Sequence, residues 1–312
     1  MMQETLVAVE EFSKSYSERP AVTGLDFEVR RGELFGLIGP DGAGKTTTMR
    51  SIVTLLRPDT GRITVNGHDT RTDIGAIRAI LGYMPQRFSL YPDLSVEQNL
   101  RFFADLFSVP KSELPARLAR LYRFSRLQPF ATRLAGRLSG GMKQKLALSC
   151  TLIHNPVLLV LDEPTTGVDP LSRSEFWDIL RELRDDGVTI VVSTPYMDEA
   201  MFCDRITIMH EGRALAFGSP RELITSLRLP MYAIRNPELV MRFSEIETVT
   251  GVASVQTFGD SLHVTTSAGI PADTIAREIT ERVGVTVHLE SIAPSLEDVF
   301  ISLIEGGTRH GG

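Results

Sequence analysis

Cysteine is scarce in this sequence, and the two that occur, Cys150 and Cys203, lie in unrelated segments without the spacing of metal ligands. This usage argues against a disulfide framework and indicates reduced thiols in a cytoplasmic protein. A surplus of positive charge is missing too, because the net charge is −6. We therefore expect no nucleic acid as the main partner.

Long apolar runs are also absent. The longest charge-free stretch, 146–161, contains His154, Asn155 and Pro156, whereas a membrane-spanning helix needs about 20 mostly apolar residues. The first residues, MMQETLVAVEEF, lack a basic segment followed by an apolar one, so we expect no secretory signal. Any membrane role of this chain is expected to come through a partner.

What the sequence does have is enough apolar material, 42% of 312 residues, for one sizeable core and a smaller second domain. Alternation and continuous apolar runs predict its elements. These are antiparallel strands within 5–31, a buried strand at 34–38, helices at 94–107, 115–124 and 141–154, strands at 157–161 and 188–193, and a helix at 172–185. Ser95 and Gln98 have capping-box spacing at one helix start. Apolar strands separated by a helix predict an α/β fold with a parallel sheet covered on both faces.

After residue 220 the pattern changes to strand, helix, two strands, helix and strand, which predicts a small ferredoxin-like α+β domain. The expected elements are a strand at 231–235, a helix at 237–247, a hairpin of 252–257 with 262–266, a helix at 271–283 and a strand at 285–289. A last helix starts at Pro294-Ser295 and is expected to end before Gly306. The predicted domains are 1–220 (with a helical subdomain at about 88–155), 221–305, and a flexible tail at 306–312.

Residues 39–46, GPDGAGKT, fit the P-loop pattern G-x-x-x-x-G-K-[ST] between a strand and a helix. Glycines let the backbone curl so that N–H groups face phosphate oxygens, at a helix N-terminus with about half a positive charge. Lys45 is expected to reach the β- and γ-phosphates, and the Thr46 hydroxyl to ligate Mg²⁺. The predicted ATP-binding residues here are Gly39, Pro40, Asp41, Gly42, Ala43, Gly44, Lys45, Thr46 and Thr47.

The apolar strand 158–161 ends in two acids, Asp162 and Glu163. A buried strand end that presents one carboxylate to Mg²⁺ and the next to a water molecule suits phosphate hydrolysis. We expect Asp162 to hold the ion and Glu163 to position or deprotonate the attacking water. Two acids at a strand end also occur by accident, and the P-loop upstream favours the functional interpretation.

Residues 138–145, LSGGMKQK, open a helix with a serine and two glycines, which makes a second anion site of backbone N–H groups. A second phosphate-binding edge has no use within a chain that has one P-loop. It has a use if two chains face each other head to tail and each closes over the other's ATP. Here the sequence resembles the ABC ATPase family, whose signature is LSGG. The signature residues expected to contact the facing chain's ATP are Ser139, Gly140, Gly141, Met142 and Gln144.

The resemblance extends over residues 1–220 and implies a P-loop NTPase core with a mixed sheet, an antiparallel β subdomain and a helical subdomain. Tyr16 matches the aromatic residue that stacks on adenine, although it could also be an ordinary strand-end tyrosine. Gln86 matches the glutamine that touches Mg²⁺ and links the site to the helical subdomain, and Asp169 matches the D-loop at the dimer interface. The segment 88–100 resembles the family segment beside the groove for a permease. The resemblance thus implies Glu163 and Gln86 as catalytic residues and Thr46, Gln86 and Asp162 around Mg²⁺.

One departure from the family pattern concerns the switch histidine, expected in T-H-x-x-D-E-A. The sequence is Ser193-Thr-Pro-Tyr-Met-Asp-Glu-Ala200, which puts Pro195 at this position. Proline offers neither an imidazole nor a backbone N–H to the γ-phosphate. We therefore hypothesise that this site binds ATP well but hydrolyses it slowly. Asp41, where the family usually has asparagine, is a milder departure: its carboxylate either weakens binding slightly or is kept away from the triphosphate by the loop.

The segment 294–300, PSLEDVF, resembles the ending of ATPases that serve drug and antibiotic exporters with a separate permease pair of the ABC-2 type. It could also be an ordinary amphipathic helix. The resemblance implies an ATP-hydrolysing subunit, peripheral on the inner face of the cell membrane, that powers a transmembrane permease.

Two alternatives remain open. The chain could be one half of an asymmetric pair, with another cassette in a second subunit or in the same longer polypeptide, which Pro195 favours. It could instead be a soluble ABC ATPase acting on ribosomes or DNA. The single P-loop, the acidic balance and the absence of a heptad insertion argue against that second alternative.

Overall fold

The computed structural model describes residues 4–87, 90–227, 229–267 and 269–309, and side chains as far as residue 304. The chain folds as two compact units, Met1–Pro220 and Arg221–Gly312. The elements of the first unit are β1 (Thr5–Tyr16), β2 (Arg19–Arg30), β3 (Leu34–Ile38), α1 (Lys45–Ile52), β4 (Thr60–Val65), β5 (His68–Asp69), α2 (Ile74–Ile80), β6 (Leu81–Met84), α3 (Val96–Leu106), α4 (Leu114–Ser125), η1 (Gln128–Phe130), η2 (Ala135–Arg137), α5 (Gly140–Leu152), β7 (Leu158–Asp162), α6 (Pro170–Asp185), β8 (Thr189–Thr194), α7 (Met197–Ala200), β9 (Arg205–His210) and β10 (Arg213–Gly218).

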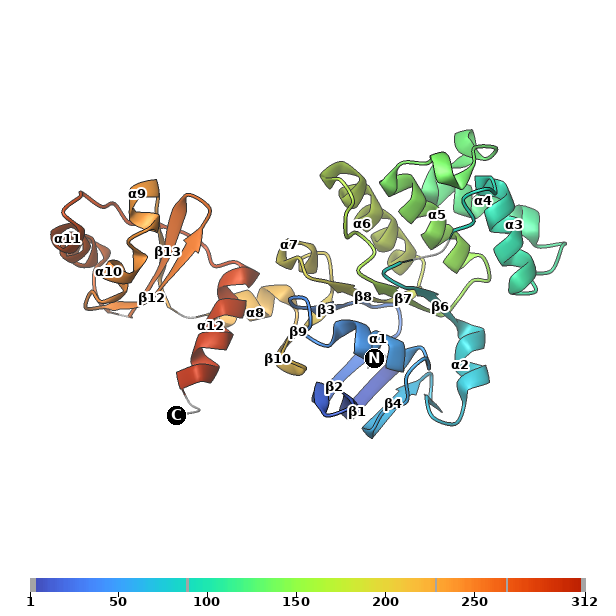
Figure 1. Ribbon diagram of the computed structural model, residues 1–312, viewed down its shortest axis with the longest axis horizontal. Coiled ribbons are helices and arrows are strands. Elements are labelled where there is room, and N and C mark those ends of the chain that lie inside the picture. Colours follow the sequence, from blue (N-terminus) through green and yellow to red (C-terminus); the bar gives the residue numbers. More distant parts are fainter. Residues whose placement is uncertain (1–3, 88–89, 228, 268, 310–312) are drawn as a thin grey trace. The chain divides into compact units, whose positions relative to one another are not determined.

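Two sheets form the centre of the first unit. One is antiparallel, in the order β2-β1-β4-β5, and the other has six strands, in the order β10-β9-β3-β8-β7-β6. In the larger sheet all neighbours are parallel except β9 and β10. Helices α3 to α6 cover one side of it, and the antiparallel sheet lies on the other side (Figure 1). The predicted α/β fold with a mixed sheet and an antiparallel subdomain is confirmed.

The central parallel strands position the functional loops. Every residue of β3, β7 and β8 is buried, as expected for strands covered on both faces. Ile38 pairs with Thr194, and Asp162 pairs with Ser193. The chain therefore leaves all three strands at the same edge of the sheet, which is where ligands bind in open α/β folds.

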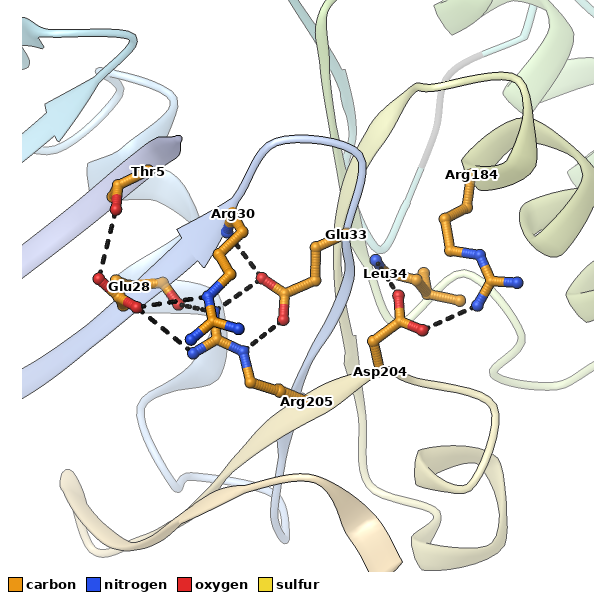
Figure 2. Close-up of polar contacts among 8 residues, drawn as sticks. All are labelled: Thr5, Glu28, Arg30, Glu33, Leu34, Arg184, Asp204 and Arg205. Atoms are coloured by element: carbon orange, nitrogen blue, oxygen red, sulfur yellow. Dashed lines mark hydrogen bonds and ion pairs between the residues drawn. The ribbon is translucent and has the colours of Figure 1, made fainter. Parts of the chain in front are cut away.

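A polar network ties β2 to the start of β9 (Figure 2). Glu33, only 6% exposed, pairs with Arg205 at 2.5 Å and accepts a hydrogen bond from the backbone N–H of Arg30. Arg205 also donates to the carbonyl oxygen of Glu28. The hydrogen bond to Glu33 raises the pKa of Arg205 above its usual value. This buried pair links the antiparallel sheet to the sheet that holds the functional edge.

The helical part of the first unit consists of α3, α4 and α5, and each begins within two residues of its predicted start. The predicted capping box of α3 is confirmed: the Ser95 hydroxyl accepts from the backbone of Gln98, whose side chain accepts from the backbone of Ser95. Asn99 fixes the preceding loop with hydrogen bonds to Tyr91 on both its side-chain oxygen and its nitrogen.

The second unit is a four-stranded antiparallel sheet in the order β12-β13-β11-β14. Its elements are α8 (Pro220–Ser226), β11 (Met231–Ile234), α9 (Pro237–Val240), α10 (Phe243–Glu247), β12 (Val252–Phe258), β13 (Ser261–Thr266), α11 (Ala272–Val283), β14 (Glu290–Ser291) and α12 (Leu296–Arg309). The order places the third strand between the first and the second, as in the ferredoxin-like arrangement that the sequence predicts. Its core is a separate cluster of aliphatic residues.

Three details of the second unit differ from prediction. The helix expected at 237–247 is two short helices separated at Met241 and Arg242, and the Arg242 side chain binds Glu245 and the carbonyl oxygen of Val283. The last strand is not 285–289 but β14, which pairs with Tyr232 and Ala233. The last helix, expected to end before Gly306, continues to Arg309. Of the predicted flexible tail, residues 310–312 lie outside the described part of the chain.

Within the residues that the structure describes, no helix is both long enough and apolar enough to cross a bilayer.

The buried Glu33–Arg205 pair gives a stability prediction. In the Arg205→Met variant the Glu33 carboxylate loses its counter-charge inside the protein, so unfolding should become easier by about 3–5 kcal/mol. The measurement is the urea midpoint of the first unit, followed by the fluorescence of Trp177, the only tryptophan in the sequence and fully buried. Arg30→Met is the control, because its ion pair with Glu28 is exposed and is expected to cost less than about 1 kcal/mol. Equal losses in the two variants would contradict the prediction.

Candidate functional site

The loop between β3 and α1 carries the predicted phosphate-binding segment. Gly44 is the N-cap of α1 with φ 98°, and a Cβ on it would lie 2.7 Å from the carbonyl oxygen of Ala21. A Cβ on Gly39, with φ 156°, would lie 2.2 Å from the carbonyl oxygen of Met209. Only glycine fits at both positions. The loop can therefore curl tightly, and the first N–H groups of α1 have no helical partner and can face an anion.

A cavity of about 400 Å³ adjoins this loop and brings together four segments that are separated in the sequence. Its lining consists of Ala21, Asp41, Gly42, Ala43, Gly44, Lys45, Thr46, Thr47, Gln86 and Glu163. The P-loop, the predicted glutamine and the predicted catalytic acid thus meet in one cavity. Gly39 and Pro40 are not part of its lining; they support it from behind through their carbonyl oxygens.

Lys45 is held at the base of the cavity with only 3% of its surface exposed. Its ammonium group donates to the carbonyl oxygens of Gly39 at 2.7 Å and Pro40 at 2.9 Å. It also lies 3.3 Å from a carboxylate oxygen of Glu163. A buried ammonium with these partners can move onto an incoming phosphate while Glu163 balances its charge.

Asp162 ends β7 and lies directly behind the P-loop. Its Oδ1 atom accepts hydrogen bonds from the hydroxyls of Thr46 at 3.0 Å and Ser193 at 2.8 Å. Burial raises the pKa of Asp162, and the two hydrogen bonds oppose that rise. The other oxygen, Oδ2, is buried without a hydrogen-bond partner. A buried carboxylate with one unsatisfied oxygen is costly unless a cation or donor meets it.

These features fit a magnesium ion. Among the described residues there is no cluster of three or more His, Cys, Asp or Glu side chains that could hold a metal. One hydroxyl and one carboxylate are what Mg²⁺ uses beside nucleotide phosphates, since it retains water ligands and rarely sits in an all-protein cage. Thr46 and Asp162 would hold the ion. Gln86, which the resemblance places at the metal, contacts Glu163 in this structure.

Glu163 has the most constrained backbone of the site. It has φ 49°, a left-handed conformation that costs a non-glycine residue about 1–3 kcal/mol and is found mainly at functional sites. Its N–H donates to the Ser193 hydroxyl at 3.0 Å, and its side chain accepts from Gln86 at 2.9 Å and Thr166 at 3.4 Å. The carboxylate is thereby aimed into the cavity with only 7% of the residue exposed.

Tyr16 ends β1 and is 46% exposed, with its hydroxyl 3.5 Å from that of Thr47. It does not line the cavity, but this contact places its ring beside the P-loop helix. An exposed aromatic ring at that place can stack on a flat heterocycle. Asp41, the departure from the family pattern, is exposed at the cavity.

The predicted signature residues lie elsewhere in this structure: none of residues 139–142 lines the P-loop cavity as described. Ser139 is the N-cap of α5 and accepts from the N–H of Met142. Gly140 is exposed, whereas a Cβ on Gly141 would lie 2.4 Å from the Ser172 side chain. The start of α5 is therefore an accessible helix N-terminus packed tightly on α6.

Gln144 and Asp169, the remaining predicted residues, also lie away from the P-loop cavity. Gln144 lines a larger cavity of about 470 Å³ together with Gln86. Asp169 is the N-cap of α6 and accepts from the backbone N–H of Ser172, a hydrogen bond that lowers its pKa.

Pro195 follows β8, whose last carbonyl oxygen, that of Thr194, accepts from the N–H of Gly39 at 3.4 Å. The position is therefore next to the P-loop, as the family pattern implies. Of the histidines that the structure describes, none lines the cavity. The loop is nevertheless well ordered by Glu199, which is 1% exposed and accepts from Thr194 at 2.5 Å and Thr165 at 2.8 Å.

The sequence analysis did not identify two residues that the structure places beside the site. Ser193 donates to the carboxylate of Asp162, the last residue of β7, and accepts from the backbone N–H of Glu163, which follows it. Arg173 lies 4.3 Å above the ring of Tyr196 and 3.5 Å from Glu199. The available signal for Ser193 was its polar side chain near the end of the otherwise apolar β8. Arg173 had no comparable signal, because its partners lie on a different element.

Comparison with known proteins agrees with this geometry. Residues 22–166 match the family model of the ABC transporter ATP-binding domain, and residues 218–304 match that of the C-terminal domain of DrrA1-3-like ATP-binding proteins. The Nod factor export ATP-binding protein I of Paraburkholderia xenovorans is 36% identical over 304 residues, which cover 97% of this chain and 98% of that one. The probable multidrug ABC transporter ATP-binding protein YbhF of Escherichia coli is 42% identical over 295 residues. The match covers 93% of this chain but 50% of the multidrug relative. The chain therefore spans about half the length of that relative.

Solved structures give the same result for the first unit. The cassette cbiO1 of Clostridium perfringens, part of an ABC transporter complex, has a TM-score of 0.67 and 29% identity, covering 72% of this chain and 92% of that one. The cassette MJ0796, solved as a dimer in a post-hydrolysis state with ADP and Pi, has a TM-score of 0.62 and 25% identity, covering 69% and 98%.

Ser193 gives a prediction about the support of the site. Ser193→Ala removes the acceptor of the Glu163 N–H and a donor to Asp162, both buried, so unfolding should become easier by about 1–3 kcal/mol. The urea midpoint reported by Trp177 measures this. Ser51→Ala is the matched control, because the buried Ser51 hydroxyl donates to a helical carbonyl, that of Thr47, and its loss leaves no buried N–H without an acceptor. A loss no larger than that of Ser51→Ala would show that Ser193 does not support the two acids.

Proposed function

The chain belongs to the family of ABC transporter ATP-binding subunits, and from that premise we propose that it binds and hydrolyses ATP to power a separate transmembrane permease of an exporter. The observation that carries the proposal is the constrained Glu163, aimed into the P-loop cavity and bonded to Gln86 and Lys45. A carboxylate there can accept the proton of a water molecule that attacks the γ-phosphate of ATP.

The other residues of the cavity bind and orient the nucleotide. The curled P-loop binds the phosphates through its N–H groups, and Lys45 exchanges its carbonyl and carboxylate partners for the β- and γ-oxygens. Thr46 and Asp162 would hold Mg²⁺, which would supply charge neutralisation of the phosphates. Gln86 fixes the Glu163 carboxylate, and the adenine stacks on Tyr16. Residues 39–47 thus bind and orient, and Glu163 moves the proton.

Two such chains are proposed to act as a dimer. The accessible helix start at Ser139 and Gly140 offers N–H groups to an anion but does not reach the cavity of its own chain. A second chain placed head to tail would bring Ser139, Gly140, Gly141, Met142 and Gln144 to the ATP of the first. The related cassette MJ0796 forms a dimer. Asp169, exposed at the start of α6, would lie at the same interface.

The permease partner is proposed from the relatives and from the larger cavity. Relatives are named for multidrug transport and for Nod factor export, which supports export. The cavity of about 470 Å³ lies between Gln86 and the helical part, with Arg87, Pro92, Lys143 and Gln144 among its lining residues. An element of a permease bound there would touch the residue that bonds Glu163. We place the chain on the inner face of the cell membrane, with an ABC-2 type permease suggested by the segment 294–300.

Glu163→Gln tests the proposed chemistry. The amide cannot accept the proton of water, so steady-state ATP turnover with Mg²⁺ should fall by roughly 10²- to 10⁴-fold. ATP binding, measured with a fluorescent analogue, should persist or strengthen, because Lys45 loses a competing carboxylate. The control is Glu10→Gln, an exposed position on β1. Turnover by Glu163→Gln equal to that of the unaltered chain would refute the assignment.

Pro195 supports a second proposal, a cassette that binds ATP but turns it over slowly beside a more active partner cassette. Pro195 lies next to the P-loop without an imidazole or an N–H to offer.

The Pro195→His variant tests the second proposal. Introducing the imidazole should raise steady-state turnover by about tenfold or more, as one added donor to a transition-state phosphate does. Pro195→Ala is the control, because it restores the backbone N–H without the imidazole. Brisk turnover by the unaltered chain, or no gain with histidine, would exclude slow hydrolysis caused by this position.

A further inference from the structure

The charge of this chain is distributed very unevenly. Between Glu113 and Asp162 the sequence has six arginines, two lysines and no acidic residue, although the whole chain has a net charge of −6. The stretch forms α4, η1, η2, α5 and their connections, which belong to the helical part of the first unit. Such a segregated charge needs either internal partners or an external one.

Internal partners account for only part of it. Arg117 pairs with Glu113, Arg120 with Asp186, and Lys145 with Glu175. The four arginines that follow, from the last turn of α4 to the end of the connection before α5, are all exposed, and none has a carboxylate within ion-pair distance among the residues described. We call these four the basic patch: Arg123, Arg126, Arg133 and Arg137.

Local structure holds the patch outward. Arg126 is the C-cap of α4 in a left-handed conformation, and Arg133 lies 4.6 Å above the ring of Phe130. Arg123 lies 5.4 Å above the ring of Phe124. Stacking on aromatic rings restricts a guanidinium without satisfying its N–H donors. The patch therefore presents partly ordered donors to an outside acceptor.

Apolar side chains lie beside the Arg133 part of the patch. The connection is bonded to the start of α3: the Val96 N–H donates to the Arg133 carbonyl oxygen, and the Gly136 N–H to that of Pro92. Helices α3, α4 and α5 lie together on the same side of the sheet (Figure 1). Three large apolar side chains in this area are 37–45% exposed, namely Tyr91, Phe102 and Leu134. Tyr91 and Phe102 also pack on each other at 4.5 Å.

We propose that the basic patch and its apolar border bind the anionic headgroups of a lipid membrane surface. Guanidinium groups bind phosphates with two parallel hydrogen bonds, and half-exposed Tyr, Phe and Leu side chains suit the boundary between headgroups and acyl chains. Each arginine near an anionic surface strengthens binding by roughly fivefold at moderate salt. The net negative chain is repelled from such a surface unless it turns this patch toward it, so the patch also selects an orientation.

This inference goes beyond the proposed ATP chemistry and does not rest on it. An acidic protein surface or a nucleic acid could also meet four arginines. The aliphatic and aromatic border favours a membrane, because lipid can accept apolar side chains beside its phosphates. The other two occupants become outcomes of the test.

The test is co-sedimentation of the purified chain with vesicles of phosphatidylcholine containing about 30% phosphatidylglycerol, at about 50 mM salt. Binding is expected, and it should be lost with pure phosphatidylcholine or at about 500 mM salt, where screening is strong. The variant with all four arginines of the patch changed to glutamine should bind at least roughly 100-fold more weakly. The matched control changes four other exposed arginines to glutamine: Arg57, Arg213, Arg221 and Arg277.

Fluorescent-ATP binding by the patch variant should equal that of the unaltered chain, which separates this inference from the proposed function and shows that the variant is folded. The inference would be overturned by no binding to anionic vesicles at low salt, by equal losses in the patch and control variants, or by patch-dependent binding to RNA without binding to vesicles. Binding to native membranes that disappears when their proteins are digested would assign the patch to a protein and overturn it too.

Discussion

The end of β7 is the constraint on which the rest of the site depends. A parallel strand buried on both faces ends in two acids, and neither can be buried without partners. Asp162 finds the hydroxyls of Thr46 and Ser193, and Glu163 finds Lys45 and Gln86. The four partners come from three segments at the same edge of the sheet: the start of α1, β8 and the loop after β6. Pairing of the two carboxylates thus brings the P-loop, the glutamine loop and β8 together around one cavity.

The sequence predicted the parts of this arrangement that rest on local rules. The P-loop, the acids after an apolar strand and the capped start of α3 follow from spacing and burial over a few residues. It missed the contribution of Ser193, because a hydroxyl that bonds two acids on a neighbouring strand is a property of register, not of spacing. For the same reason β14 lies after the predicted strand: its pairing with Tyr232 and Ala233, far away in sequence, decided where it formed.

The loop around Pro195 is held in place by side-chain contacts although it has proline where the family has the switch histidine. Glu199 is buried and bound by Thr194, Thr165 and Arg173, so the chain before and after the proline is fixed by side chains that need no histidine. An unsupported buried carboxylate destabilises the fold, so these contacts hold the loop beside the P-loop independently of the residue at position 195.

Helix α5 connects the two surfaces that face outward from this unit. It begins at Ser139, two residues after the basic patch ends, and it packs on α3, α4, α6 and β6. Strand β6 leads directly to Gln86 and so to Glu163. A ligand at the start of α5 and a surface on the patch therefore act on the same rigid helix. If binding at either place shifts α5, the coupling free energy between the two must be reciprocal. Closure of a dimer over ATP would then change the affinity of the patch for its partner. Binding of that partner would change the free energy of dimer closure by the same amount.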